Sequence, residues 1–321
     1  MQLPVPQSFI ITTEACNEFL KLETTEIRGS DDAIYISSEE TLKEVKKEAG
    51  DLSDDLIQEV ESHVHEIEKI QHRTFGGRKS EFPLLFSVRA SPVVNQQSLF
   101  PTVLNLGYND VACHQISEAT GNMHYALDLY ARFLRHFGTS VMGIDDSRYG
   151  ALVHEQVGKR GLKDDSDFTL SDLQQVIIQF KAITNAPTDA HAQLKMAIAA
   201  CFMSWNCSNA SAYRKNHGIA ENNGLAVVIQ AMVYGNFNSR SGTGIAFTRN
   251  PYDGSSEMVV QFLQNNSGDD LLKKNIPTLS RTELADLSPN CHKALSDAAA
   301  KLENYYKNSK YIYRIVIIII G

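Results

Sequence analysis

The sequence SRSGTGIAFTRNP occupies residues 239–251. Its glycine-rich part, Gly242-Thr243-Gly244, predicts a tight hairpin tip, and the apolar residues after it predict a strand. Small residues let backbone N–H groups approach an anion, and an arginine at the end of a strand, here Arg249, can hold a phosphate. We therefore expect a phosphate-binding element here. An ordinary tight hairpin explains the same residues, and the local pattern alone favours that alternative.

Apolar runs on both sides of this stretch predict further β-strands. They cover residues 8–12, 83–88, 102–106, 225–233 and 258–263, and the β-branched and aromatic residues 311–320 predict a last strand. An exposed run such as Ile315–Ile320 promotes aggregation. We therefore expect that run to form a central strand buried on both faces, or to be covered by a partner protein.

Between these strands, residues 111–200 have an almost wholly helical pattern. Tyr125, Leu129 and Phe133 recur at steps of four residues, and Gly138 is expected to end their helix. Outside this block, Ser53 and Ser288-Pro289 are expected to begin helices, as Thr169 is within it. The pattern predicts an α+β fold with a helical block between two β-containing parts.

Composition excludes several classes of protein. The chain has 321 residues, of which 43% are hydrophobic and 21% charged, so it can bury a sizeable core and is not wholly disordered. The net charge of −8 argues against a general nucleic-acid binder. The longest apolar run is too short to cross a membrane, and the 5 scattered cysteines indicate reduced thiols in a cytoplasmic protein.

Two further places carry charged residues of interest. Arg89 follows the predicted strand 83–88 and is placed to meet a ligand phosphate, although a lone arginine more often pairs with a surface carboxylate. Asp269 and Asp270 follow the predicted strand 258–263 and can hold Mg²⁺, although paired acids in a polar loop are usually just solvated. The 10 histidines show no spacing typical of a metal site.

Taken together, these segments resemble one family, in order and spacing from about residue 4 to residue 307. The matching stretches include VPQSF (5–9), PLLFSVR (83–89), TVLNLGYND (102–110), QAMVYGN (230–236) and SGTGIAFTRNP (241–251). The chain is similar to the N-terminal nucleotide-binding region of pyruvate phosphate dikinase. That resemblance implies an ATP-grasp-like nucleotide-binding fold with an inserted helical subdomain. Its parts are expected at 1–110 (N-terminal subdomain), 111–200 (helical subdomain) and 201–321 (C-terminal subdomain with an incomplete last sheet).

The resemblance also implies a chemistry. The family interconverts ATP, phosphate and pyruvate with AMP, pyrophosphate and phosphoenolpyruvate, and a histidine on a separate domain carries the phosphoryl group. It implies ATP or AMP with Mg²⁺ as cofactors, although the chain could also hold none. The candidate nucleotide-binding residues are Arg89, Gly242, Thr243, Gly244 and Arg249, and Asp269 and Asp270 are the weak candidates for metal.

The departures from the family pattern weigh against catalysis. The family's glycine-rich segment with a phosphate-binding lysine would precede Val5, and its glycine loop is replaced by residues 96–102 without glycine. Ser239 and Arg240 stand where the family has an acidic pair, Tyr311 and Tyr313 stand where it has an acidic metal-binding strand, and its glutamine strand would follow. Phosphoryl transfer depends on positioning and on cations that neutralise charge, so these losses predict a rate lower by about 10⁴-fold or more.

Three functions remain open. The first is a non-catalytic binding or structural module in a larger protein assembly, with the Ile315–Ile320 strand as a contact for other proteins and no role for nucleic acid or membrane. The second is a functional ATP-binding half that works with a separate phosphohistidine domain. The third is a nucleotide sensor that binds through Arg89 and Arg249. We expect a cytoplasmic protein, bound to a large cytoplasmic or cytoskeletal assembly in the first case.

Overall fold

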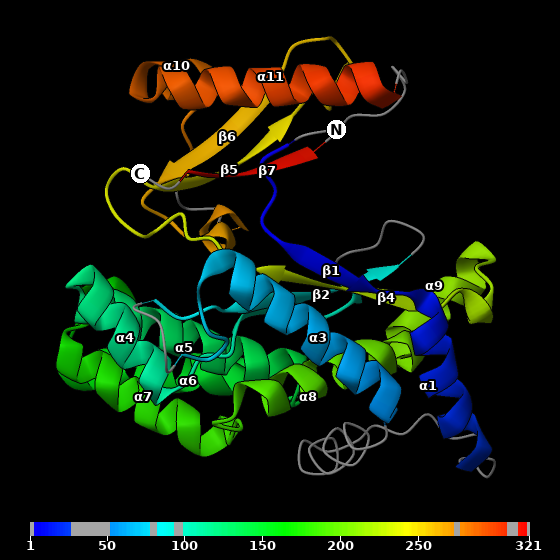
Figure 1. The fold of residues 1–321 in the computed structure, drawn as a ribbon. Helices are drawn as coiled ribbons and strands as arrows, with labels where there is room; N and C mark the ends of the chain where they lie inside the picture. Colours follow the sequence, from blue (N-terminus) through cyan, green and yellow to red (C-terminus); the bar gives the residue numbers. More distant parts are fainter. Residues whose placement is uncertain are drawn as a thin grey trace. The chain divides into compact units, whose positions relative to one another are not determined.

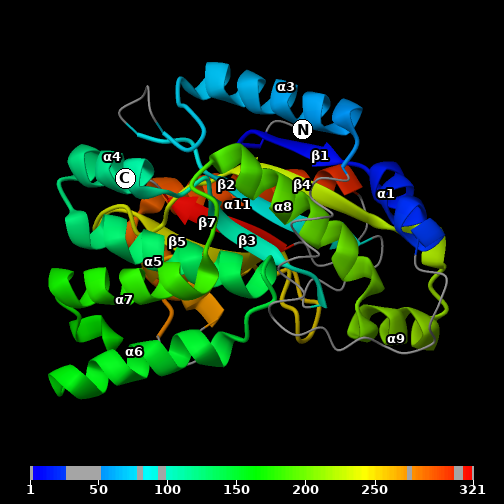
Figure 2. The ribbon, with the colours of Figure 1, turned by 90° about the horizontal axis from the view of Figure 1, so that it is seen from below.

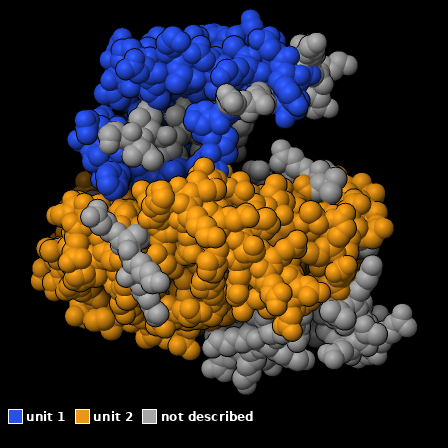
Figure 3. Space-filling model, in the orientation of Figure 1, with its two compact units in different colours: residues 1–6, 233–321 blue, residues 7–232 orange. Residues whose placement is uncertain are grey.

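The chain divides into two compact units (Figure 3). The computed structural model describes residues 3–26, 52–77, 82–92, 99–272, 277–306 and 314–319. Unit 2 comprises Gln7–Met232, and unit 1 comprises Met1–Pro6 with Val233–Gly321. Each unit combines helices with an antiparallel sheet, which confirms the mixed helix-and-sheet class. The three-part division at residues 110 and 200 stays a prediction.

Unit 2 is built on a four-stranded antiparallel sheet in the order β1-β4-β2-β3. Its strands are β1 Ser8–Ile11, β2 Phe86–Pro92, β3 Thr102–Leu106 and β4 Leu225–Ala231. Strand β4 alternates between buried and half-buried residues, because only one of its faces is fully covered. Strand β2 begins three residues later than predicted and extends to Pro92, past the predicted end at Val88. Arg89 therefore lies within the strand and not after it.

The helices of unit 2 follow the sequence pattern closely. They are α1 Thr13–Glu26, α3 Asp54–Gln71, α4 Asp110–Thr120, α5 Met123–Ser140, α6 Asp146–Arg160, α7 Leu170–Thr184, α8 Ala190–Met203 and α9 Ser208–His217. Ser53 caps α3, and Thr169 forms a capping box with Asp172 at the start of α7, as predicted. Helices α5, α6 and α7 lie side by side (Figure 2), and the expectation of a helical block is confirmed.

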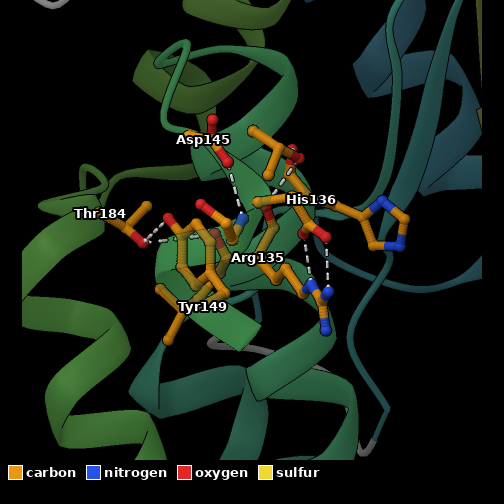
Figure 4. A network of polar contacts seen from close by, with 9 residues as sticks. Arg135, His136, Asp145, Tyr149 and Thr184 are labelled. Carbon is orange, nitrogen blue, oxygen red and sulfur yellow. Dashed lines mark hydrogen bonds and ion pairs between the residues drawn. The ribbon is translucent and has the colours of Figure 1, made fainter. Parts of the chain in front are cut away.

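Gly138 does not end its helix as the sequence analysis predicts. Helix α5 continues to Ser140, and a Cβ added at Gly138 would lie 1.7 Å from the Tyr149 hydroxyl of helix α6. That hydroxyl lies 2.7 Å from Thr184 Oγ1 of helix α7, which donates to the Leu134 carbonyl (Figure 4). The glycine is therefore needed for close helix packing, and its conformation is ordinary helix.

Unit 1 contains a three-stranded antiparallel sheet in the order β6-β5-β7. Its elements are β5 Gly242–Phe247, β6 Val259–Gln264, the 3₁₀ turn η5 Gly268–Leu272, α10 Arg281–Leu287, α11 Pro289–Tyr306 and β7 Arg314–Ile319. Helices α10 and α11 cover one face of the sheet (Figure 1), where Ala246, Val260 and Phe262 pack against helix residues such as Leu284, Leu295 and Ala299. Pro289 begins α11, as predicted.

Strand β7 corrects the expectation for the isoleucine run. The strand pairs with β5 only, so among the described strands it lies at an edge of the sheet and not in the centre. Ile320, Tyr311, Tyr313 and residues 96–98 lie outside the described residues. In the part of the chain that the structure describes, no helix is both long and apolar enough to cross a bilayer.

Candidate functional site

Arg89 lies on the half-open face of the unit 2 sheet. Side chains alternate along a strand, so Ser87 and Arg89 share one face of β2 while Val88 is buried on the other. The neighbouring strand places Gln230 directly opposite Ser87. Arg89 Nη2 donates to Gln230 Oε1 at 2.7 Å and to Ser87 Oγ at 3.5 Å. A neutral carboxamide therefore orients this guanidinium and leaves its charge uncompensated by that partner.

Partial desolvation acts on Arg89 although the residue as a whole is exposed. Desolvation by neighbouring atoms lowers the pKa of its guanidinium below the usual range, and an arginine side chain stays charged at neutral pH. A charged and oriented guanidinium on an open sheet face is suited to a phosphate group.

Arg249 has a different environment, in unit 1. It follows strand β5, and its side chain pairs with Glu303 of helix α11. Arg249 Nε lies 3.1 and 3.2 Å from the two carboxylate oxygens, and Nη2 lies 2.9 Å from Oε2. Thr248 Oγ1 donates to Oε1 of the same carboxylate at 2.7 Å. Pairing with a carboxylate is the alternative predicted for Arg89, whose hydrogen bonds go to a carboxamide and a hydroxyl. Such a pair occurs instead at Arg249.

The Arg249–Glu303 pair is partly shielded from water. The side chains are 24% and 22% exposed, so the pair is screened less than an ordinary surface ion pair. Hydrogen bonds from Arg249 and then Thr248 lower the pKa of the Glu303 carboxyl below its usual 4.5. The carboxylate is therefore ionised at neutral pH and neutralises the charge of Arg249.

Gly242 and Gly244 lie inside strand β5, not at a hairpin tip. A Cβ at Gly244 would lie 2.7 Å from the Gln261 carbonyl oxygen, and one at Gly242 would lie 2.1 Å from the Phe262 ring. The expectation of a hairpin tip is wrong. The Phe262 side chain of β6 lies against β5, and residues without a Cβ leave room for its ring. Thr243 is fully buried, and its hydroxyl has no partner among the described residues. The roles of these residues in nucleotide binding stay predictions.

The predicted metal carboxylates lie in the turn η5. Asp270 is buried, and its Oδ2 accepts a hydrogen bond from the Ser267 backbone N–H at 3.0 Å, so the carboxylate stabilises its own turn. The side chain of Asp269 lies outside the described residues. Among the described side chains, no group of three potential ligands is arranged around a metal position. A role for Asp269 and Asp270 in metal binding stays a prediction.

The candidate residues belong to both units. Arg89 lies in unit 2, whereas Gly242, Thr243, Gly244, Arg249 and Asp270 lie in unit 1. The partners of the two arginines, Glu303 and Gln230, were not among the predicted site residues. Glu303 follows the buried residues Leu295 and Ala299 at steps of four residues, so it lies on the apolar face of the helix. An acid at such a position predicts a charged partner. Gln230 could have been noticed as the polar residue of the otherwise apolar strand β4.

A second arginine–carboxylate pair lies in unit 2 (Figure 4). Arg135 of helix α5 donates from Nε and Nη2 to the two oxygens of Asp146, both at 2.6 Å. Neighbouring Asp145 caps helix α6 by accepting from the Ser147 backbone N–H. These contacts join α5 to the start of α6. The Arg135 and Asp146 side chains are 42% and 59% exposed, so this pair is a more solvated counterpart of Arg249–Glu303.

Comparison with known proteins agrees with the sequence motifs. Residues 1–264 match the model of the family described as pyruvate phosphate dikinase, AMP/ATP-binding domain. The chain is 31% identical over 317 residues to the pyruvate, phosphate dikinase of Clostridium symbiosum, a match that covers 95% of this chain and 33% of that protein. It is 33% identical over 322 residues to the Giardia intestinalis protein of the same name, again covering 95% and 33%. The chain therefore spans about a third of the length of these relatives.

Proposed function

Since the chain belongs to the pyruvate phosphate dikinase family through its AMP/ATP-binding domain, we propose that it binds AMP or ATP without transferring a phosphoryl group. In this role it acts as a binding module of a larger cytoplasmic protein assembly, with an ATP-grasp-like fold. The resemblance supports nucleotide binding, and Arg89 supplies an oriented positive charge for a phosphate. Mg²⁺ binds together with the nucleotide in this proposal, as the family resemblance implies.

One observation carries the non-catalytic part of the proposal. In unit 1, two charged groups expected to hold phosphate and metal, Arg249 and Asp270, already have partners within the fold. Glu303 pairs with Arg249, and the Ser267 N–H donates to Asp270. The sequence adds uncharged or basic residues where the family has acids: Ser239, Arg240, Tyr311 and Tyr313. Fewer cations and metal-binding carboxylates mean less stabilisation of the charge that develops during phosphoryl transfer.

The test is to follow the γ-phosphate of ATP. The purified chain with Mg-ATP, in the presence and absence of phosphate, should bind nucleotide by calorimetry while releasing or transferring no γ-phosphate above a buffer control. γ-Phosphate transfer at a rate near that of a full-length relative would overturn the proposal. Absence of binding for both AMP and Mg-ATP would remove its nucleotide-binding part.

The alternative is a functional ATP-binding half that works with a separate phosphohistidine domain. The extent of the family match favours it, because residues 1–264 match the model of the AMP/ATP-binding domain. Adding a phosphohistidine domain from a relative discriminates between the two. Transfer of ³²P from γ-labelled ATP or from phosphate to that domain's histidine supports the alternative, and an unlabelled histidine supports the binding module.

Strand β7 is the proposed contact for other proteins. It pairs with β5 on one side and has no paired strand on the other among the described residues, and edge strands accept further strands. Deletion of residues 315–321 should raise solubility and reduce capture of the assembly's other proteins. If neither quantity changes, the strand is not an interface.

A further inference from the structure

Glu303 occupies the edge of Arg249 that would bind a phosphate. Arginine binds phosphates and carboxylates through the same planar arrangement of N–H donors. In this chain the carboxylate takes hydrogen bonds from Nε and Nη2, the two nitrogens on one edge of the guanidinium. A phosphate cannot use that edge while Glu303 remains there.

The contact also joins two distant parts of unit 1. Arg249 follows strand β5, whereas Glu303 lies in the last turn of helix α11, 54 residues later. Thr248, the residue directly after β5, also donates to this carboxylate. Three donor groups of residues 248–249 therefore contact one carboxylate of helix α11. Displacement of Glu303 would therefore break these hydrogen bonds between the end of α11 and residues 248–249.

We propose that Glu303 is an internal competitor that sets the affinity of Arg249 for a phosphate group, so that a phosphate bound there releases the end of helix α11. The inference rests on the proposed function, because it assumes that the phosphate-bearing ligand reaches Arg249. The ligand class is a nucleotide phosphate or pyrophosphate, whose charge exceeds that of a single carboxylate.

Thermodynamic linkage predicts two measurable effects, one on phosphate affinity and one on the opening of the end of helix α11. If Glu303 and the phosphate exclude each other at Arg249, removing the carboxylate strengthens phosphate binding, and phosphate binding weakens the hold on α11. A purely structural ion pair behaves otherwise, because its loss destabilises the unit and leaves phosphate affinity unchanged or weaker. Affinity and helix opening therefore distinguish the two roles.

The experiment compares Glu303→Gln with Asp297→Asn. Both substitutions remove one negative charge from helix α11, but Asp297 is exposed and pairs with Lys293, away from Arg249. Calorimetric titration with inorganic pyrophosphate and with AMP should show affinity raised by about 5-fold or more in Glu303→Gln, at the low end of usual coupling between sites, and no such rise in Asp297→Asn. Thr248→Val removes one donor from the carboxylate and should give a smaller rise, which keeps the test usable if Glu303→Gln folds poorly.

Hydrogen exchange supplies the second readout. Pyrophosphate should speed amide exchange at the end of α11 in the unaltered chain and change it little in Glu303→Gln. Nucleotide binding with equal affinity in the unaltered chain and Glu303→Gln would overturn the competitor role and leave the proposed function intact. Weaker binding in Glu303→Gln would also overturn it, and absence of any binding in either protein would overturn both proposals.

Discussion

Arg89 and Arg249 are the same residue type in two β-sheet units, yet their partners differ. A carboxamide holds Arg89 on an exposed face, whereas a carboxylate holds Arg249 in a half-buried position. The carboxamide orients a guanidinium and leaves its charge in place, and the carboxylate neutralises it. An arginine in a family-like motif therefore indicates phosphate binding only if its hydrogen-bond partner leaves its positive charge in place.

The largest expected effect concerns the glycines near Arg249. Gly244→Ala would bring a Cβ within 2.7 Å of the Gln261 carbonyl oxygen, and we expect unfolding free energy to fall by about 1–3 kcal/mol, the usual cost of overpacking. Gly150→Ala is the matched control, since it lies in helix α6 with open space around its Cβ; it should be neutral or gain up to about 1 kcal/mol. Urea unfolding checks both. An unchanged stability of Gly244→Ala would mean that packing does not explain the glycine.

The next largest effect is the loss of unfolding free energy when each of the two arginines is replaced by alanine. Arg249→Ala leaves the Glu303 carboxylate partly buried without its main partner, so we expect a loss of about 1–2 kcal/mol, below the cost of breaking a fully buried pair. Arg89→Ala leaves only neutral groups behind and should stay within about 0.5 kcal/mol of the unaltered chain. Thermal and urea unfolding of the two variants provide the measurement. Equal losses would contradict the contrast between the two sites.

Acid should weaken the Arg249–Glu303 pair selectively. The folded state lowers the pKa of Glu303 below its usual 4.5, so the carboxylate stabilises the fold above pH 4.5 and that contribution is lost as pH falls through the lowered pKa. The stability advantage of the unaltered chain over Glu303→Gln should therefore be complete at pH 7 and shrink in the acid range below pH 4.5. Unfolding midpoints measured from pH 7 downward test this, and a constant difference at every pH would refute it.

Of the two ion pairs, Arg135–Asp146 is expected to show the smaller effect. This pair has good geometry but is more exposed than Arg249–Glu303. Arg135→Ala should cost less than about 1 kcal/mol, as is usual for solvated ion pairs. Because the two pairs share the same chemistry, the difference between Arg135→Ala and Arg249→Ala measures the effect of burial. A larger loss at Arg135 would show that exposure does not rank these contacts.

Much of the local structure could be predicted from the sequence. Strand 102–106 and the helix starts at Ser53, Thr169 and Pro289 depend on nearby residues, whose propensities and caps are readable. Gly138 and Gly244 could not be interpreted in this way. A glycine that ends an element and one that makes room for a distant side chain have the same sequence signal, and only the packing of Tyr149 or Phe262 separates them.

The candidate site was predictable in its residue types but not in its partners. Arg89 and Arg249 stood out in their motifs, yet what holds them is a glutamine 141 residues away and a glutamate 54 residues away. Contacts at that separation are set by strand pairing and helix packing, which local patterns do not determine. The placement of Asp270 shows the same limit, since the sequence alone does not reveal that its carboxylate is buried and accepts a hydrogen bond from its own turn.

The central claim is that Arg89 provides most of the positive charge for a nucleotide phosphate, whereas Arg249 adds little net affinity because Glu303 must first be displaced from it. Calorimetric titration of AMP into the unaltered chain, Arg89→Ala and Arg249→Ala tests it most directly. Arg89→Ala should weaken binding by about 10-fold or more, the effect of losing a charged hydrogen bond, while Arg249→Ala stays within about 3-fold. Weakening by Arg249→Ala alone, or equally by both substitutions, would contradict the account.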